Sequence, residues 1–96
     1  MTLKTVVKNW ALVHIKDDLS PFKIIWGIAE ESGRFISGDY ICSSRIINIE
    51  DNLVRTLTGS LYELNGPGNE YVASYMQLME LMSGISPAEL NLDIKH

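Results

Sequence analysis

The chain has few of the sequence features that cross-link a small protein or anchor it in a membrane. Cys42 is the single cysteine among 96 residues, which excludes an internal disulfide and a cysteine-ligated zinc site. No apolar run approaches the ~18–20 residues that a helix needs to cross a bilayer. The opening "MTLKTVVKNW" also lacks the long apolar core of a signal peptide. We therefore expect one domain, residues 1–96, in the cytoplasm and without membrane contact.

Basic residues are scarce as well. Eight lysines and arginines stand against twelve acidic residues, and the net charge is −4. Aromatic side chains with Arg34, Arg45 and Arg55 could form a nucleic-acid platform on a curled sheet, but the shortage of basic charge argues against it. An inhibitor that mimics nucleic-acid charge would need its acids on one face, whereas they occur in scattered pairs. We expect no nucleic-acid partner.

What the chain does contain is a long stretch of strand-forming sequence. Residues 9–16 and 22–29 alternate in hydrophobicity, and the first of these segments has apolar residues on both faces, as expected of a central strand. Gly27 indicates a bulge or a closely approaching backbone. Residues 30–33 predict a hairpin turn, and the next strand, residues 34–49, is long enough to need a bulge at Gly38-Asp39. Turns at residues 50–52 and 58–60 separate two further strands.

A helix is expected after the sheet. "NGPGN", residues 65–69, predicts the end of the sheet, with Asn69 as the cap of a helix over Glu70–Met82. Gly84 predicts its end, and "SPAEL" begins a second helix with a capping box of Ser86 and Glu89. The apolar stripe of the first helix includes Val72, Tyr75, Met76, Met79 and Met82, and Leu78 and Leu81 widen it. Such a methionine run is either core or an adaptable binding face, and we expect core.

These elements define the fold class. We predict an α+β fold in which a bent antiparallel meander of five or six strands, shaped as a half-open barrel, packs against the C-terminal helix.

The stretch "SGRFISGDYICSSRI", Ser32 to Ile46, holds the residues most suggestive of chemistry. It is no phosphate cradle, because strand-forming sequence follows its glycines where a helix is needed. A nucleophile at Cys42, Ser43 or Ser44 would need His14 as its base, and no G-x-S-x-G elbow is present. The acidic pairs at residues 17–18, 30–31 and 50–51 fall at strand ends, where charge keeps turns solvated. We expect no catalytic, cofactor or metal site and no enzymatic activity.

The order of several short motifs adds a resemblance. Trp26-Gly27, Gly33-Arg34-Phe35, Gly38-Asp39-Tyr40, Ser43-Ser44-Arg45-Ile46 and "VRTLTGSLYELNGPG" follow one another between Trp26 and Gly68. In this order they resemble a family of small, uncharacterised bacterial proteins carried on mobile DNA, such as integron gene cassettes and prophages. The resemblance implies a bacterial cytoplasmic protein with an accessory role, and it assigns no site residues.

We therefore expect a non-enzymatic binding module whose partner is another protein or its own copy in a homodimer. A chain this short has a small core, and association supplements it where no disulfide or metal is available. Ile25, with Ile46, Ile47 and Ile49, supplies more apolar surface than one helix can cover. The alternative is a small-ligand binder or cryptic enzyme whose pocket lies between sheet and helix, lined by Trp26, Tyr40 and Tyr62.

Overall fold

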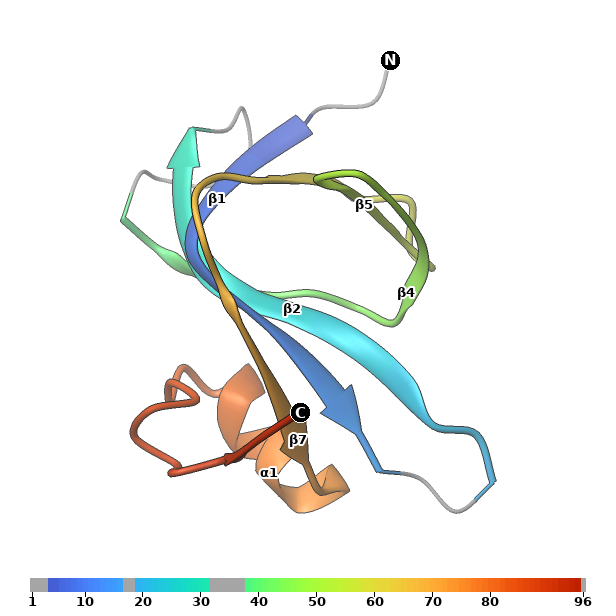
Figure 1. Cartoon of the computed structure of the whole chain (residues 1–96), viewed down its shortest axis with the longest axis vertical. Coiled ribbons are helices and arrows are strands. Elements are labelled where there is room, and N and C mark those ends of the chain that lie inside the picture. Colours follow the sequence, from blue (N-terminus) through green and yellow to red (C-terminus); the bar gives the residue numbers. More distant parts are fainter. Residues whose placement is uncertain (1–3, 17–18, 32–37, 96) are drawn as a thin grey trace.

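The computed structural model describes residues 4–16, 19–31 and 38–95. Their fold is one mixed sheet and one short helix, so the α+β class is confirmed (Figure 1). The sheet has eight strands in place of five or six, and it is not closed like a barrel. In chain order the elements are β1 (Lys4–Ile15), β2 (Phe22–Glu31), β3 (Tyr40–Cys42), β4 (Ile46–Glu50), β5 (Leu53–Thr56), β6 (Leu61–Leu64), β7 (Asn69–Ala73), α1 (Tyr75–Met82) and β8 (Asp93–Ile94).

Strand β1 lies at the centre of the sheet, as its two apolar faces predict. It pairs with β2 in antiparallel fashion on one side. On the other side its first half pairs with β6 and its second half with β7, both in parallel. The principal strand order is β3-β2-β1-β6-β5-β4, and β8 adds to β7. The prediction of a simple antiparallel meander is therefore wrong.

The parallel pairings arise from the loop at residues 65–68. Leu64 is the last residue that pairs with the first half of β1, and Asn69 is the first that pairs with its second half. The Gly-Pro-Gly sequence thus interrupts a path along β1 without ending the sheet. The residues from Asn69 onward gain ladder hydrogen bonds to β1, and these outweigh their capacity to begin a helix.

A bulge in β1 decides which core each residue enters. Asn9 and Trp10 together face only Gly27 on β2, and Asn9 has a φ of 50°, a left-handed conformation that asparagine tolerates. The extra residue moves the odd-numbered side chains of β1 to the opposite face, so that Val7 and Ala11 enter different cores. A Cβ on Gly27 would meet Val7 Cγ1 and lie 3.2 Å from Trp10 Cα, which confirms the predicted close approach.

Two apolar cores result, one on each face of the long β1–β2 pair. Figure 1 shows α1 near one end of the molecule and the β4–β5 hairpin toward the other. The helix-side core contains Ala11, Val13, Ile15, Ile24, Trp26, Ala73, Leu78, Leu81 and Leu92. The sheet-side core contains Val7, Ile25, Ala29, Ile41, Val54 and Tyr62.

The predicted strand over residues 34–49 is two strands in its described part. Gly38 and Asp39 both bond to Ala29, since the Gly38 N–H donates to Ala29 O at 2.8 Å and the Ala29 N–H donates to Asp39 O at 2.7 Å. This pattern, with a Gly38 φ of 98°, fits the predicted bulge. The strand then breaks at Ser43, whose hydroxyl accepts the Ile25 N–H at 2.8 Å in place of a ladder carbonyl. Residues 32–37, which include part of the predicted hairpin turn, lie outside the described residues.

Helix α1 begins five residues later than predicted. Residues 69–73 form β7, and Ser74 is the cap in place of Asn69. The Gln77 N–H donates to Ser74 Oγ at 3.1 Å, and the Ser74 N–H donates to Gln77 Oε1 at 2.8 Å. This capping box is an S-x-x-Q signal in the sequence, and it lies five residues beyond the Asn69 cap that the turn residues predict.

The chain after α1 matches the prediction in part. Gly84 ends the helix with a φ of 106°, while its N–H donates to Leu81 O and the Ile85 N–H donates to Glu80 O, a Schellman motif. Ser86 and Glu89 form the predicted box of reciprocal bonds at 3.1 and 3.2 Å. A single turn follows rather than a second helix, because buried Leu92 and strand β8 return the chain to the sheet.

Candidate functional site

The residues that could have supported catalysis are not brought together. Cys42 packs against the helix-side core, and burial raises the pKa of its thiol to about 11. His14 alternates with the core residues Val13 and Ile15, so it points from the opposite face of β1, where its Nε2 lies 2.8 Å from Glu70 Oε1. The Ser43 hydroxyl donates to Ser44 O. Among these described residues, no nucleophile is paired with a base.

The charged candidates are dispersed in the same way. Arg45 lies over the ring of Phe22, 4.5 Å from its centroid, and Arg55 is exposed on β5. Arg34 and the acidic pair at residues 17–18 lie outside the described residues. Within the described part of the chain, no three histidine, cysteine or acidic side chains are grouped as metal ligands would be.

Two of the three residues predicted to line a pocket are in contact. The rings of Trp26 and Tyr40 stack, with centroids 6.0 Å apart and planes inclined by 14°. Tyr62 is buried in the sheet-side core, on the other face of the sheet. The structure therefore does not place Tyr62 beside the other two.

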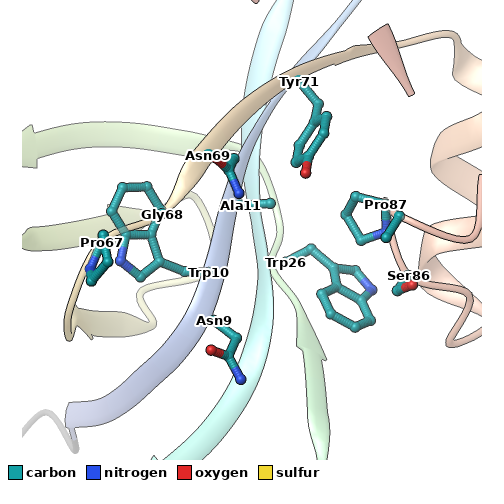
Figure 2. A pocket seen from close by; sticks show the side chains of 11 residues that line it. Asn9, Trp10, Ala11, Trp26, Pro67, Gly68, Asn69, Tyr71, Ser86 and Pro87 are labelled. Carbon is teal, nitrogen blue, oxygen red and sulfur yellow. The ribbon is translucent and has the colours of Figure 1, made fainter. Parts of the chain in front are cut away.

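A cavity of about 290 Å³ lies next to Trp26, between the β1 bulge, the loop at residues 65–68 and the turn after α1. Figure 2 shows Trp26, Tyr71, Ser86 and Pro87 on one side of β1, and the indole of Trp10 on its other side, beside Pro67 and Gly68. The remaining lining residues are Asn9, Ala11, Asn69 and Ala88. Tyr40 and Tyr62 are not among them.

The cavity forms because the regular strand structure of β1 and that of the neighbouring β6–β7 segment are interrupted side by side. The bulge at Asn9 and Trp10 lies beside the loop that separates β6 from β7. The indole of Trp10 packs flat on Gly68, where an added Cβ would overlap the ring, and its Nε1 donates to Gly66 O at 2.9 Å. No local sequence signal could have revealed this site, since it depends on a pairing between segments more than fifty positions apart.

The exposed side of α1 is a second candidate, and it corrects the predicted orientation of the helix. Leu78 and Leu81 are the buried residues of α1. The methionines that we expected to be core are exposed, with 77% for Met76, 63% for Met79 and 60% for Met82. Tyr75, also predicted to be apolar core, is 57% exposed. We call Tyr75, Met76, Met79 and Met82 the methionine face.

The methionine face is continuous along the helix. Tyr75 and Met79 are four residues apart, and Met79 and Met82 are three apart, spacings at which side chains are neighbours on a helix surface. Strand β7 fixes how the chain enters α1, and this entry turns the two leucines toward the core. The predicted stripe begins at Val72, which lies in β7 and not in the helix.

A third apolar surface lies on the β4–β5 hairpin and the turn that follows β5. Ile47 is 56% exposed and Leu57 is 67% exposed, while Ile49 and Leu53 are exposed to a smaller degree. Strand β4 is at the end of the principal strand order. The excess of isoleucine in the sequence predicts an apolar patch at such an edge strand. The exposed apolar side chains of α1 are larger than those of this patch.

Comparisons of the chain with protein-family models, with curated proteins and with solved structures find no match. The resemblance to proteins of mobile DNA therefore stays a prediction. Among the described residues, α1 is the only α-helix, and it is far too short to span a bilayer.

Proposed function

We propose that this protein is a non-enzymatic interaction module that forms a homodimer through the methionine face of α1. The observation that carries the proposal is the exposure of four large apolar side chains on a helix of eight residues. Monomeric proteins rarely expose a contiguous apolar patch of this kind to water. Methionine is suited to such a surface, because its flexible side chain repacks against different shapes.

The chemistry of the helix supports a second copy as the partner. Gln77 and Glu80 are the two polar side chains of α1, and Gln77 is used in the capping box. The methionine face itself carries no charge, and the exposed Glu80 lies at its border, four residues after Met76. Two-fold pairing of one patch with itself is the commonest form of association between copies of a chain.

The position of α1 in the molecule is compatible with this pairing. The molecule is elongated, with extents of 35 × 26 × 23 Å, and α1 lies near one end of its longest axis (Figure 1). A second copy that approaches from this end meets α1 before it reaches the β4–β5 hairpin. Pairing through α1 therefore leaves the curled part of the sheet free for other contacts.

The cellular setting of the proposal comes from the resemblance in the sequence. On that resemblance, the protein is a cytoplasmic accessory protein of a bacterial mobile element that binds a protein partner in addition to its own copy. The neighbouring genes test this part, since integrase, cassette or prophage genes beside this one are expected.

Static light scattering tests the dimer. The expected mass at micromolar concentration is twice the 10.8 kDa of one chain. Met79→Glu places a charge in the middle of the methionine face and should give a monomer, whereas Met79→Leu should remain dimeric. Leu57→Glu is the matched control, because it replaces an equally exposed apolar residue outside α1. A wild-type mass near 10.8 kDa, or dissociation by Leu57→Glu and not by Met79→Glu, would refute the proposal.

A further inference from the structure

The cavity beside Trp10 and Trp26 has walls that are already fixed. Trp10 Nε1 donates to Gly66 O at 2.9 Å, and Trp26 Nε1 donates to Leu81 O at 3.2 Å. Trp26 is held further by its stacking on Tyr40. Since its indole N–H is engaged elsewhere, Trp26 offers only ring carbons to a molecule that enters. Trp10 closes the opposite side, where its ring packs on Gly68 and against the sheet-side core. A pocket of preformed aromatic walls with a few polar groups is the usual form of a small-molecule site.

The polar groups at this cavity are free to bind a ligand. The side-chain amides of Asn9 and Asn69 have no hydrogen-bond partner among the described residues, and neither has the Tyr71 hydroxyl. Figure 2 shows that hydroxyl pointing toward Pro87 and Trp26. Each amide offers both a donor and an acceptor, and the hydroxyl offers one of each. The site can therefore satisfy several mixed hydrogen-bonding groups at once.

The charge of the site restricts the ligand class. None of the described residues that line the cavity has an ionisable acidic or basic side chain. A phosphate or carboxylate would find no cation there. A purely apolar ligand would remove Tyr71 and the two asparagines from water without giving them partners, which is unfavourable for each group.

We propose that this cavity binds the ring of an uncharged sugar. A pyranose has a face of C–H groups that can lie against an indole, and it has hydroxyls that donate and accept at its edge. It thus uses the tryptophan carbons, the asparagine amides and the Tyr71 hydroxyl together, without needing a charge. The proposal is independent of the dimer, because the cavity and the methionine face share no residue.

Intrinsic fluorescence is a direct measurement, since both tryptophans of the chain line the cavity. The full-length protein is titrated with a panel of neutral monosaccharides, including glucose, galactose and N-acetylglucosamine. Glucose 6-phosphate, adenosine and indole serve as a charged, a planar polar and an apolar comparison. We expect a saturable change in emission with at least one neutral sugar and at least tenfold weaker binding of the phosphorylated one.

Variants then connect the signal to the cavity. Tyr71→Phe removes only the hydroxyl, and Asn9→Gly removes an amide while it keeps the left-handed backbone conformation accessible. Each should weaken binding of that sugar at least tenfold, whereas Asn48→Ala, an exposed asparagine on β4, should bind as the wild type does. Circular dichroism shows whether each variant is folded. If Asn9→Gly is unfolded, sugar binding by folded Tyr71→Phe alone decides the test.

Three results would overturn the proposal. They are the absence of a saturable change with any neutral sugar of the panel, tighter binding of adenosine or indole than of every sugar, and unchanged sugar binding in both folded cavity variants.

Discussion

Trp26 and Tyr40 stack on each other and donate to consecutive carbonyls at the end of α1. The Trp26 indole N–H bonds to Leu81 O at 3.2 Å, and the Tyr40 hydroxyl bonds to Met82 O at 3.0 Å. The last carbonyls of a helix lack partners within the helix, so these two donors from β2 and β3 complete its C-terminal end. They also fix α1 on the sheet in the orientation that exposes the methionine face.

The Tyr40→Phe variant tests this relationship. It keeps the stacked ring but removes the bond to Met82 O, and we expect the free energy of unfolding to fall by about 1 kcal/mol. Urea denaturation measures the change. Tyr75→Phe is the control, because the Tyr75 hydroxyl has no hydrogen bond to a described residue and should cost less than about 0.5 kcal/mol. Equal stability of Tyr40→Phe and the wild type would show that the hydroxyl does not hold the helix end.

The Ser74→Ala variant tests the observed start of α1. Loss of the hydroxyl leaves the Gln77 N–H without its partner, and we expect a cost of about 1 kcal/mol in thermal or urea unfolding. Asn69→Ala should leave α1 intact, since Asn69 is the first residue of β7. A larger cost for Asn69→Ala than for Ser74→Ala would favour the helix start that the sequence predicted.

Gly27→Ala tests the contact between the β1 bulge and β2. The added Cβ meets Val7 Cγ1 and the backbone of Trp10 and Lys8, so we expect a loss of about 1–3 kcal/mol. Gly59→Ala is a useful comparison, because its Cβ would have open space around it and only the φ of 90° is unfavourable. Should Gly27→Ala unfold at the same urea concentration as the wild type, the close packing at Gly27 would be wrong.

Cys42 should be unreactive in the folded protein. With a pKa of about 11 in place of 9.0, its thiolate fraction at pH 8 is about a hundredfold lower than in the unfolded chain, so modification by Ellman's reagent should be slower by a similar factor. Because folding raises this pKa, the contribution of Cys42 to the free energy of unfolding is fully present below pH 9.0. It is lost as the pH rises toward about 11. Rapid modification of the native protein would contradict this account.

Features that depend on neighbouring residues could be predicted from the sequence. The turn at Gly59, the end of α1 at Gly84 and the box of Ser86 and Glu89 all follow from local backbone chemistry. The alternation in β1 likewise predicted a central strand. Such signals act within a few residues, and at these positions the structure follows them.

Features that depend on distant pairing could not be predicted. "NEYVA", residues 69–73, can begin a helix or extend along β1, and only the presence of β1 decides for a strand. The side of α1 that is buried follows from that choice. The cavity requires the Asn9 bulge and the Gly66–Gly68 loop to lie side by side, so of the three predicted pocket residues only Trp26 lines it.

The solvent accessibility of the methionine methyl groups tests the central claim most directly. In spectra of methyl-labelled protein at a concentration where light scattering gives the dimer mass, a soluble paramagnetic agent should broaden the signals of Met76, Met79 and Met82 only weakly. Tyr75→Glu places a charge on the methionine face and should give a monomer. In this variant the same three signals should broaden strongly, because their side chains are more than half exposed in a single chain. A dimer whose three methyl groups remain fully accessible would contradict association through the methionine face.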